Sequence, residues 1–419
     1  MSVTTQFSQL RQDIAGHSLV ELADRFGTPS YVYDLSKILQ RVADLQAFDT
    51  IRYAQKACSN IAILDRLRRA DVLVDAVSTG EIGRALRAGY QPSQIVYTAD
   101  VFDRDALELV IQKNVPVNVG SPDMIDQLGQ RAPGRNITLR INPGFGHGHS
   151  QKTNTGGPQS KHGIWYQQID DCLLRADRHG LVVTGLHIHI GSGTDFEHLS
   201  QVCGAMEQAC LRVGRTVTTI STGGGLPVPY REGQSYIDLD QYYQLWNAAR
   251  DRIAEQLGHS IHLEIEPGRY LVAESGYLVT EICAIKTMGE NLFYMVDAGF
   301  SDLARPILYG AYHPISICHR NPPASDRQVE VVVGGPLCES GDIFTQEEGG
   351  FVSRRSLPVA QVGDLLVLEV AGAYGFAMSS NYNSRFRACE VLLEEGQAKQ
   401  IRRRESLDEL LELESIPAV

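Results

Sequence analysis

Eight short apolar segments, each followed by an amphipathic segment, repeat between residues 51 and 285 of this 419-residue chain. In the amphipathic segments, such as "GEIGRALRAGY", apolar residues recur at intervals of three and four residues, a spacing typical of helices. Eight strand and helix units in about 235 residues predict a TIM-type (β/α)8 barrel, which typically takes about 250 residues. The predicted strands are residues 51–57, 72–78, 95–100, 116–121, 137–144, 182–191, 217–225 and 261–268.

After about residue 285 the pattern changes to β-rich runs such as "NLFYMVDAG" and "VEVVVGG", with proline and glycine between them. This change predicts an α/β chain with a barrel domain at 36–285 and a second β-rich, barrel-like domain at 286–419. The N-terminal segment 1–35 is expected to pack with the β domain. A short helix is expected in "SLDELLELE", because Ser406 and Glu409 form a capping-box pattern.

The composition limits the partners and the location of the protein. A formal net charge of -12 argues against a nucleic-acid partner, since such proteins usually carry a basic face. No segment approaches the roughly 20 apolar residues that span a bilayer, and the first residues do not resemble a secretory signal. We therefore expect a cytoplasmic protein with a small-molecule substrate and no membrane partner.

Unusual polar residues lie at the predicted strand ends, where TIM barrels carry their active sites. A buried ammonium is costly unless it is paired or used covalently, so a lysine at a strand end is a candidate catalytic group. Three consecutive glycines after the seventh strand allow backbone N–H groups to approach a phosphate, although a simple tight turn would also use them. The residues at strand ends are Lys56, Asp75, Arg140, His187, His189, Gly223, Gly224, Gly225, Glu266 and Arg269.

A lysine and a phosphate site at a barrel mouth suggest pyridoxal phosphate, whose aldehyde forms a Schiff base with lysine. Glu266 is the candidate partner for the ring nitrogen, although it could instead anchor a loop. His187 and His189 are two residues apart, a spacing that also suits a metal-dependent barrel hydrolase. We find no convincing third and fourth ligand at the strand ends, and the eight cysteines form no CxxC pair, so we expect no metal.

Seven motifs stand in an order that resembles the fold-type III pyridoxal-phosphate decarboxylases, and among them the bacterial branch that acts on diaminopimelate. The resemblance covers nearly the whole chain and implies a barrel plus a β domain. One departure is the cysteine in "KACSN", and another is the long loop at 144–163. The motifs are "YAQKA", "HIHIGSG", "GGG", "EPGRY", "DAGFSDLARPILYG", "GPLCESGD" and "GAYG".

The resemblance implies a set of cofactor residues. Lys56 would carry the Schiff base, His189 would stack on the cofactor ring and Glu266 would pair with the ring nitrogen. Ser192, the three glycines and Tyr374 would hold the phosphate. The expected cofactor site is completed by Asp75, Arg140 and Arg269.

The resemblance also implies which residues would bind the substrate. Arg305 and Tyr309, helped by Arg269 and Tyr374, would bind its distal carboxylate, a group that suits a bidentate arginine. Two residues would enter the neighbouring subunit's site: Cys338, as proton donor, and Glu339, which would bind the distal ammonium. A homodimer with shared active sites is therefore implied.

The function that follows is decarboxylation of meso-2,6-diaminopimelate to L-lysine and carbon dioxide, the last step of lysine biosynthesis. The main alternative is a decarboxylase of the same fold that acts on ornithine, lysine, arginine or a D-isomer. Those substrates present an amine or a guanidine at the distal end, where Arg305 and Tyr309 suit a carboxylate better. A metal-dependent barrel hydrolase is the weaker alternative.

Overall fold

The computed structural model describes residues 7–146, 155–191, 195–321, 327–347 and 349–417. The chain divides into two compact units. The barrel unit comprises Leu39–Pro227 and Ile237–Leu271, and the β-rich unit comprises Met1–Ile38, Val228–Tyr236 and Val272–Val419. The boundary expected at residue 285 lies inside strand β13 (Gly276–Met288), which pairs only with strands of the β-rich unit.

Eight parallel strands form a closed barrel, because the last strand pairs with the first and the remaining neighbours pair in turn. The predicted TIM barrel is confirmed, and each predicted strand is present. A ninth strand, β9 (Ile164–Trp165), adds two residues beside β8. The barrel strands are β4 (Thr50–Ala54), β5 (Leu73–Ala76), β6 (Ile95–Ala99), β7 (Val117–Val119), β8 (Asn136–Asn142), β10 (Val182–Ile188), β11 (Thr219–Ser221) and β12 (His262–Ile265).

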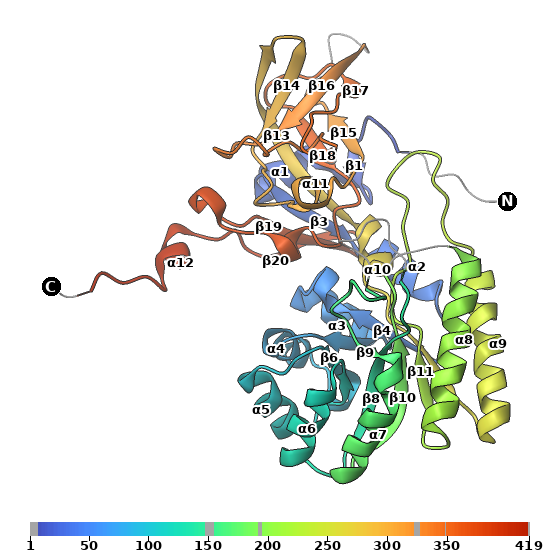
Figure 1. Ribbon diagram of the computed structural model, residues 1–419. Coiled ribbons are helices and arrows are strands. Elements are labelled where there is room, and N and C mark those ends of the chain that lie inside the picture. The colour runs from blue at the N-terminus through green and yellow to red at the C-terminus, as the bar shows by residue number, and fades with distance from the viewer. Residues whose placement is uncertain (1–6, 147–154, 192–194, 322–326, 348, 418–419) are drawn as a thin grey trace. The chain divides into compact units, whose positions relative to one another are not determined.

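Helices follow the barrel strands and bury their apolar stripes. Some of them begin at a side chain that accepts a hydrogen bond from an otherwise unpaired backbone N–H group, as Ser78 does for α4, Asp103 for α5 and Asp238 for α9. These helices are α3 (Ile61–Arg69), α4 (Thr79–Arg87), α5 (Arg104–Lys113), α6 (Pro122–Arg131), α7 (Ile169–Arg178), α8 (Phe196–Val213), α9 (Leu239–Leu257) and α10 (Arg269–Val272), with α2 (Leu35–Ala43) before β4 (Figure 1).

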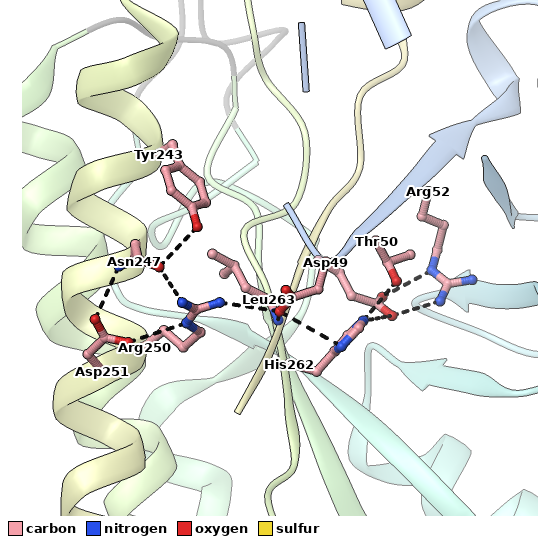
Figure 2. Close-up of polar contacts among 10 residues, drawn as sticks. Asp49, Thr50, Arg52, Tyr243, Asn247, Arg250, Asp251, His262 and Leu263 are labelled. Atoms are coloured by element: carbon pink, nitrogen blue, oxygen red, sulfur yellow. Dashed lines mark hydrogen bonds and ion pairs between the residues drawn. The ribbon is translucent and has the colours of Figure 1, made fainter. Parts of the chain in front are cut away.

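Polar contacts join the first and last barrel strands where they begin (Figure 2). The backbone N–H of Asp49 donates to Leu263 O at 3.1 Å, and Asp49 Oδ2 accepts from Leu263 N at 2.8 Å. Arg250 of α9 reaches the same carboxylate at 3.3 Å. Further along, Arg52 of β4 pairs with Glu264 of β12 at 3.0 Å. The pairing of β4 with β12, which closes the barrel, is thus stabilised by side-chain contacts as well as by backbone hydrogen bonds.

The β-rich unit is built on a sheet with the strand order β17-β16-β14-β13-β3-β19-β20, and β18 pairs with both β13 and β15. The two predicted β-rich runs, "NLFYMVDAG" and "VEVVVGG", correspond to β14 and β16. The strands are β3 (Ser30–Asp34), β14 (Asn291–Val296), β15 (Ile315–Cys318), β16 (Gln328–Gly334), β17 (Arg355–Pro358), β18 (Leu365–Leu368), β19 (Cys389–Glu394) and β20 (Gln397–Arg402), with β1 (Asp13–Ile14) and β2 (His17–Ser18) apart.

The described part of this unit includes the helices α1 (Leu19–Phe26), α11 (Arg305–Tyr309) and α12 (Leu407–Leu411). The capping box predicted for the last of them is confirmed, since Ser406 accepts from Glu409 N while the Glu409 side chain accepts from Ser406 N. Across the described ranges, no helix combines the length and the apolar character needed to cross a membrane.

Candidate active site

Polar side chains line the inside of the barrel. Alternate residues of a strand share a face, and here the inward positions near the strand ends hold charges and hydroxyls where many TIM barrels hold valine, isoleucine and leucine. Burying such groups is costly unless they are paired or used. The arrangement therefore indicates a binding site. The buried polar set comprises Arg52, Asp75, Thr98, Asn118, Arg140, His187, Ser221 and Glu266.

Lys56 follows β4 directly, in the single 3-10 turn Gln55–Ala57. Its two neighbours in that turn are buried, whereas Lys56 itself is exposed. A buried side chain holds this turn in place, because the Tyr53 hydroxyl donates a hydrogen bond to Cys58 O at 2.9 Å. The amine therefore stands on a rigid turn at the C-terminal end of the first strand, where it is accessible to a ligand.

The Glu266 carboxylate is bound on both oxygens. Ser221 Oγ donates to Oε1 at 2.7 Å, and His187 Nε2 lies 2.9 Å from Oε2. Burial alone would raise the pKa of Glu266, but the charge and hydrogen bond of His187, the Ser221 hydroxyl and the Arg52 charge outweigh it and lower that pKa to about 2. Glu266 is therefore an ionised carboxylate inside the barrel. His187, one of the two histidines on the sixth predicted strand, supports this carboxylate.

Two groups near Glu266 have shifted pKa values. Burial and the charge of Glu266 raise the pKa of Asp75 to about 6, against the opposing influence of Thr98, Lys56 and His187. Burial lowers the pKa of His189 well below its ordinary value, and the charges of Arg140 and Lys56 lower it further. An uncharged imidazole is suited to stacking on an aromatic ring.

The raised pKa of Asp75 predicts that the free energy of unfolding depends on pH. A carboxyl whose pKa is higher in the folded state than in the unfolded state stabilises the fold below its unfolded pKa, and this contribution is lost as the pH rises through about 6. From pH 4 to pH 8, Asp75→Asn should therefore become more stable relative to the parent protein by up to about 3 kcal/mol. Thermal unfolding of both proteins without ligand, measured across this range, checks it. The exposed Asp177→Asn is the control, and an equal trend in both variants would contradict the prediction.

The three glycines form a surface that only glycine can provide. Gly223 and Gly225 have φ angles of +64° and +99°, which side-chain-bearing residues rarely adopt. A Cβ on Gly224 would lie 2.4 Å from Glu266 O, and one on Gly225 would lie 2.3 Å from Gly191 O. A cavity beside this loop is lined by residues that include His189, Asp195, Thr222, Gly224, Gly225 and Trp246.

The long loop after β8 is anchored beside this site. Asn142 Oδ1 accepts from Gly157 N at 2.9 Å, and Thr155 Oγ1 donates to His189 O at 2.9 Å. At the end of the loop His162 Nδ1 lies 2.6 Å from Asp100 Oδ2. Nothing in the sequence marked Thr155 as a partner of His189, because the two residues are 34 positions apart.

The barrel unit brings together most of the residues predicted there. Lys56, Asp75, Arg140, His189 and Glu266 influence one another electrostatically. Arg269 begins α10, just beyond β12. Ser192 lies outside the described residues. Two groups that the prediction missed, Arg52 and Ser221, occupy inward strand positions, and polar residues in otherwise apolar strands were the signal that could have found them.

The remaining predicted residues lie in the β-rich unit. Arg305, the first residue of α11, is buried, and its NH1 is 2.8 Å from His313 Nε2. Tyr309 at the end of the same helix is 39% exposed. Tyr374 has a φ of +59°, an uncommon conformation that often marks a functional position. His313 was missed because the motif that contains Arg305 ends before it.

Cys338 and Glu339 lie on a loop organised by one carboxylate. Asp342 Oδ2 accepts from Leu337 N at 2.8 Å, while its Oδ1 accepts from Phe300 N at 2.7 Å. The Cys338 thiol is free and exposed, and its backbone N–H donates to Asn383 Oδ1 at 2.7 Å. The loop thus presents the thiol on a fixed backbone.

These residues fit pyridoxal phosphate. The barrel offers an accessible amine on a rigid turn, a carboxylate held ionised and a neutral imidazole beside it. The glycine loop has no room for a Cβ at any of its three positions, and a loop without side chains lets a phosphate approach the backbone closely. Lys56, Glu266, His189 and the three glycines would hold the aldehyde, the ring nitrogen, the ring face and the phosphate, in that order.

Comparison with known proteins agrees with this reading. Residues 35–273 match the family model described as the pyridoxal-dependent decarboxylase, pyridoxal binding domain. Diaminopimelate decarboxylase from Escherichia coli is 54% identical over 408 residues, which cover 96% of this chain and 97% of that protein. A crystal structure of a diaminopimelate decarboxylase superposes with a TM-score of 0.92 at 55% identity, covering 94% of this chain and 95% of that one.

A second solved structure is that of the Helicobacter pylori diaminopimelate decarboxylase complexed with L-lysine. It matches with a TM-score of 0.85 at 32% identity, covering 94% of this chain and 98% of that one. Matches of this identity and extent, together with the family model, establish the relationship. The chain belongs to the pyridoxal-dependent decarboxylase family, in the group that contains the diaminopimelate decarboxylases.

Proposed function

We propose that this protein removes the carboxylate from the D-centre of meso-2,6-diaminopimelate to yield L-lysine and carbon dioxide, with pyridoxal phosphate as its cofactor. The substrate follows from the name shared by the similar proteins, which match the chain over nearly its full length. The single observation that carries the chemistry is the ionised Glu266, held between His187 and Ser221 beside the glycine loop.

Pyridoxal phosphate, when bound, supplies a ring that accepts the electron pair left behind as carbon dioxide departs. Glu266 would hold a proton at the ring nitrogen, because a carboxylate with a pKa of about 2 stabilises a positive charge beside it. Lys56 would anchor the aldehyde and move protons at the reacting carbon. His189, a neutral imidazole, would stack on the ring.

The β-rich unit supplies the groups that recognise the substrate. Arg305 and Tyr309 bind the distal carboxylate, Glu339 binds the distal ammonium, and Cys338 donates a proton to the carbon that has lost carbon dioxide. The exposed thiol and the rigid loop that carries it support the role of Cys338. Arg269 and Tyr374 assist in binding.

Carbon dioxide release in the presence of pyridoxal phosphate tests the function. We expect release from meso-diaminopimelate and little from L-ornithine, L-lysine, L-arginine or the D-isomers of ornithine and lysine. The substrate's distal end decides among these compounds, since only the first offers a second amino-acid centre to Arg305. Release from one of the other amino acids in place of diaminopimelate would keep the cofactor chemistry and overturn the substrate.

We further propose that the active form is a homodimer in the cytoplasm, with Cys338 and Glu339 acting in the neighbouring subunit's site. Shared sites predict that inactive Lys56→Ala and Cys338→Ala proteins regain activity when mixed, because one site of a hybrid dimer has both residues intact. Mixing that restores no activity, while sedimentation shows that hybrids form, would contradict shared sites.

A further inference from the structure

His313 lies between α11 and β15 and is almost completely buried, with 2% of its surface exposed. Both ring nitrogens have a neighbour within hydrogen-bond distance. Nε2 is 2.8 Å from Arg305 NH1, and Nδ1 is 2.9 Å from Glu369 O. The imidazole therefore links the arginine to the backbone of the sheet.

The chemistry of these two neighbours determines the state of the ring. A carbonyl oxygen can only accept, so Nδ1 must carry the hydrogen. A guanidinium can only donate, so Nε2 must offer its lone pair. His313 is thus a neutral imidazole in the Nδ1–H tautomer, and it holds Arg305 without adding a negative charge beside it.

The backbone that orients His313 is itself well anchored. Glu369 N donates to Pro314 O at 2.9 Å, and the Glu369 carboxylate accepts from Ser316 Oγ at 2.8 Å. Arg11 donates to both oxygens of the same carboxylate, at 2.8 and 2.9 Å. The carbonyl that receives the imidazole hydrogen therefore has little freedom to move.

An aromatic ring completes the support. The Arg305 guanidinium lies over the face of Tyr230 with 4.8 Å to the ring centroid, and His313 meets the same tyrosine edge to face at 5.5 Å. A cation over an aromatic face is stabilised and keeps its full charge. His313 and Tyr230 both hold the arginine by groups that carry no net charge.

We propose that His313 is a positioning residue for substrate recognition: as a neutral hydrogen-bond acceptor it orients Arg305 and leaves the guanidinium charge for the substrate's distal carboxylate. This inference rests on the proposed function, in which Arg305 binds that carboxylate. A carboxylate side chain in place of His313 would also accept from Arg305, but it would compete with the substrate for the charge. The neutrality of the acceptor is therefore the property that matters.

Three substitutions separate these properties. His313→Gln keeps a neutral acceptor near the position of Nε2, His313→Leu removes it, and His313→Glu replaces it with an anionic one. We expect KM for meso-diaminopimelate to stay within about threefold for the glutamine variant and to rise about tenfold for the leucine variant. It should rise further for the glutamate variant, while kcat changes little in all three. Arg305→Met is the reference for complete loss of the interaction between Arg305 and the distal carboxylate.

Inhibition by two compounds distinguishes positioning from general damage to the fold. L-Lysine carries the distal carboxylate, whereas 1,5-diaminopentane is the same molecule without it. The inhibition constant for L-lysine should rise in the leucine and glutamate variants, and that for 1,5-diaminopentane should not. Equal changes for both compounds, or leucine and glutamine variants that behave alike, would overturn the proposal, even if the glutamate variant fails to fold.

The two proposals fail in different ways. If the parent protein releases no carbon dioxide from meso-diaminopimelate, the proposed function is wrong. If Arg305→Met selectively weakens L-lysine inhibition but His313→Leu does not, the function stands and the role of His313 is wrong.

Discussion

Replacing Lys56 with alanine should remove the visible absorption that an imine between this protein and pyridoxal phosphate produces. Decarboxylation should fall by about a thousandfold or more, since in the proposed function the same amine anchors the cofactor and moves protons. The reason lies in its position: Lys56 is the exposed residue of a turn whose neighbours are buried, at the C-terminal end of the first barrel strand. Absorption spectra of the protein with added cofactor, and carbon dioxide release, measure the two effects.

A second lysine of the same unit provides the control. Lys113 is the last residue of α5. Because the helices run antiparallel to the barrel strands, the end of α5 lies at the N-terminal ends of the strands, opposite the predicted site. Lys113→Ala should keep both the spectrum and the activity. A normal imine spectrum in the Lys56→Ala protein would show that another amine binds the cofactor.

Replacing Glu266 with glutamine should lower kcat by about a hundredfold or more with a small change in KM. The amide keeps the size of the side chain and can still accept from Ser221, but it carries no charge to hold a proton at the ring nitrogen. The loss should appear in kcat because that proton matters most when the departing carboxylate leaves its electron pair behind. Steady-state kinetics with meso-diaminopimelate measure both parameters.

Glu264 is the matched control because it lies in β12, two residues before Glu266, and pairs with Arg52. Glu264→Gln should lower the melting temperature and keep kcat within a few fold. If Glu266→Gln retained the parent kcat, the electrostatic role assigned to this carboxylate would be refuted.

The barrel could be predicted from the sequence because its signals are local. A short apolar run followed by a helical repeat can be recognised without knowledge of distant residues. The candidate site positions followed from the same pattern, since a parallel barrel places the C-terminal ends of all its strands on one face. Lys56, Glu266 and the glycine loop were identified in this way, and the seven motifs supported the same assignment.

The sequence could not reveal which groups control the charges in the site. The pKa of Glu266 depends on His187 and Ser221, which come from two other strands and meet it only when the barrel closes. Likewise, His313 reaches the carbonyl of Glu369 across 56 positions of the chain. Such contacts depend on how distant segments pack, and no local pattern records them.

The sequence by itself determined the eight-stranded barrel, the β-rich unit and the residues at the strand ends, because hydrophobic periodicity and turn chemistry act over a few residues. Only the tertiary structure decided that Glu266 is ionised, that His189 is neutral and that a neutral histidine holds Arg305. Those properties arise from burial and from charges brought within a few ångströms of one another, and both exist only once the chain has folded.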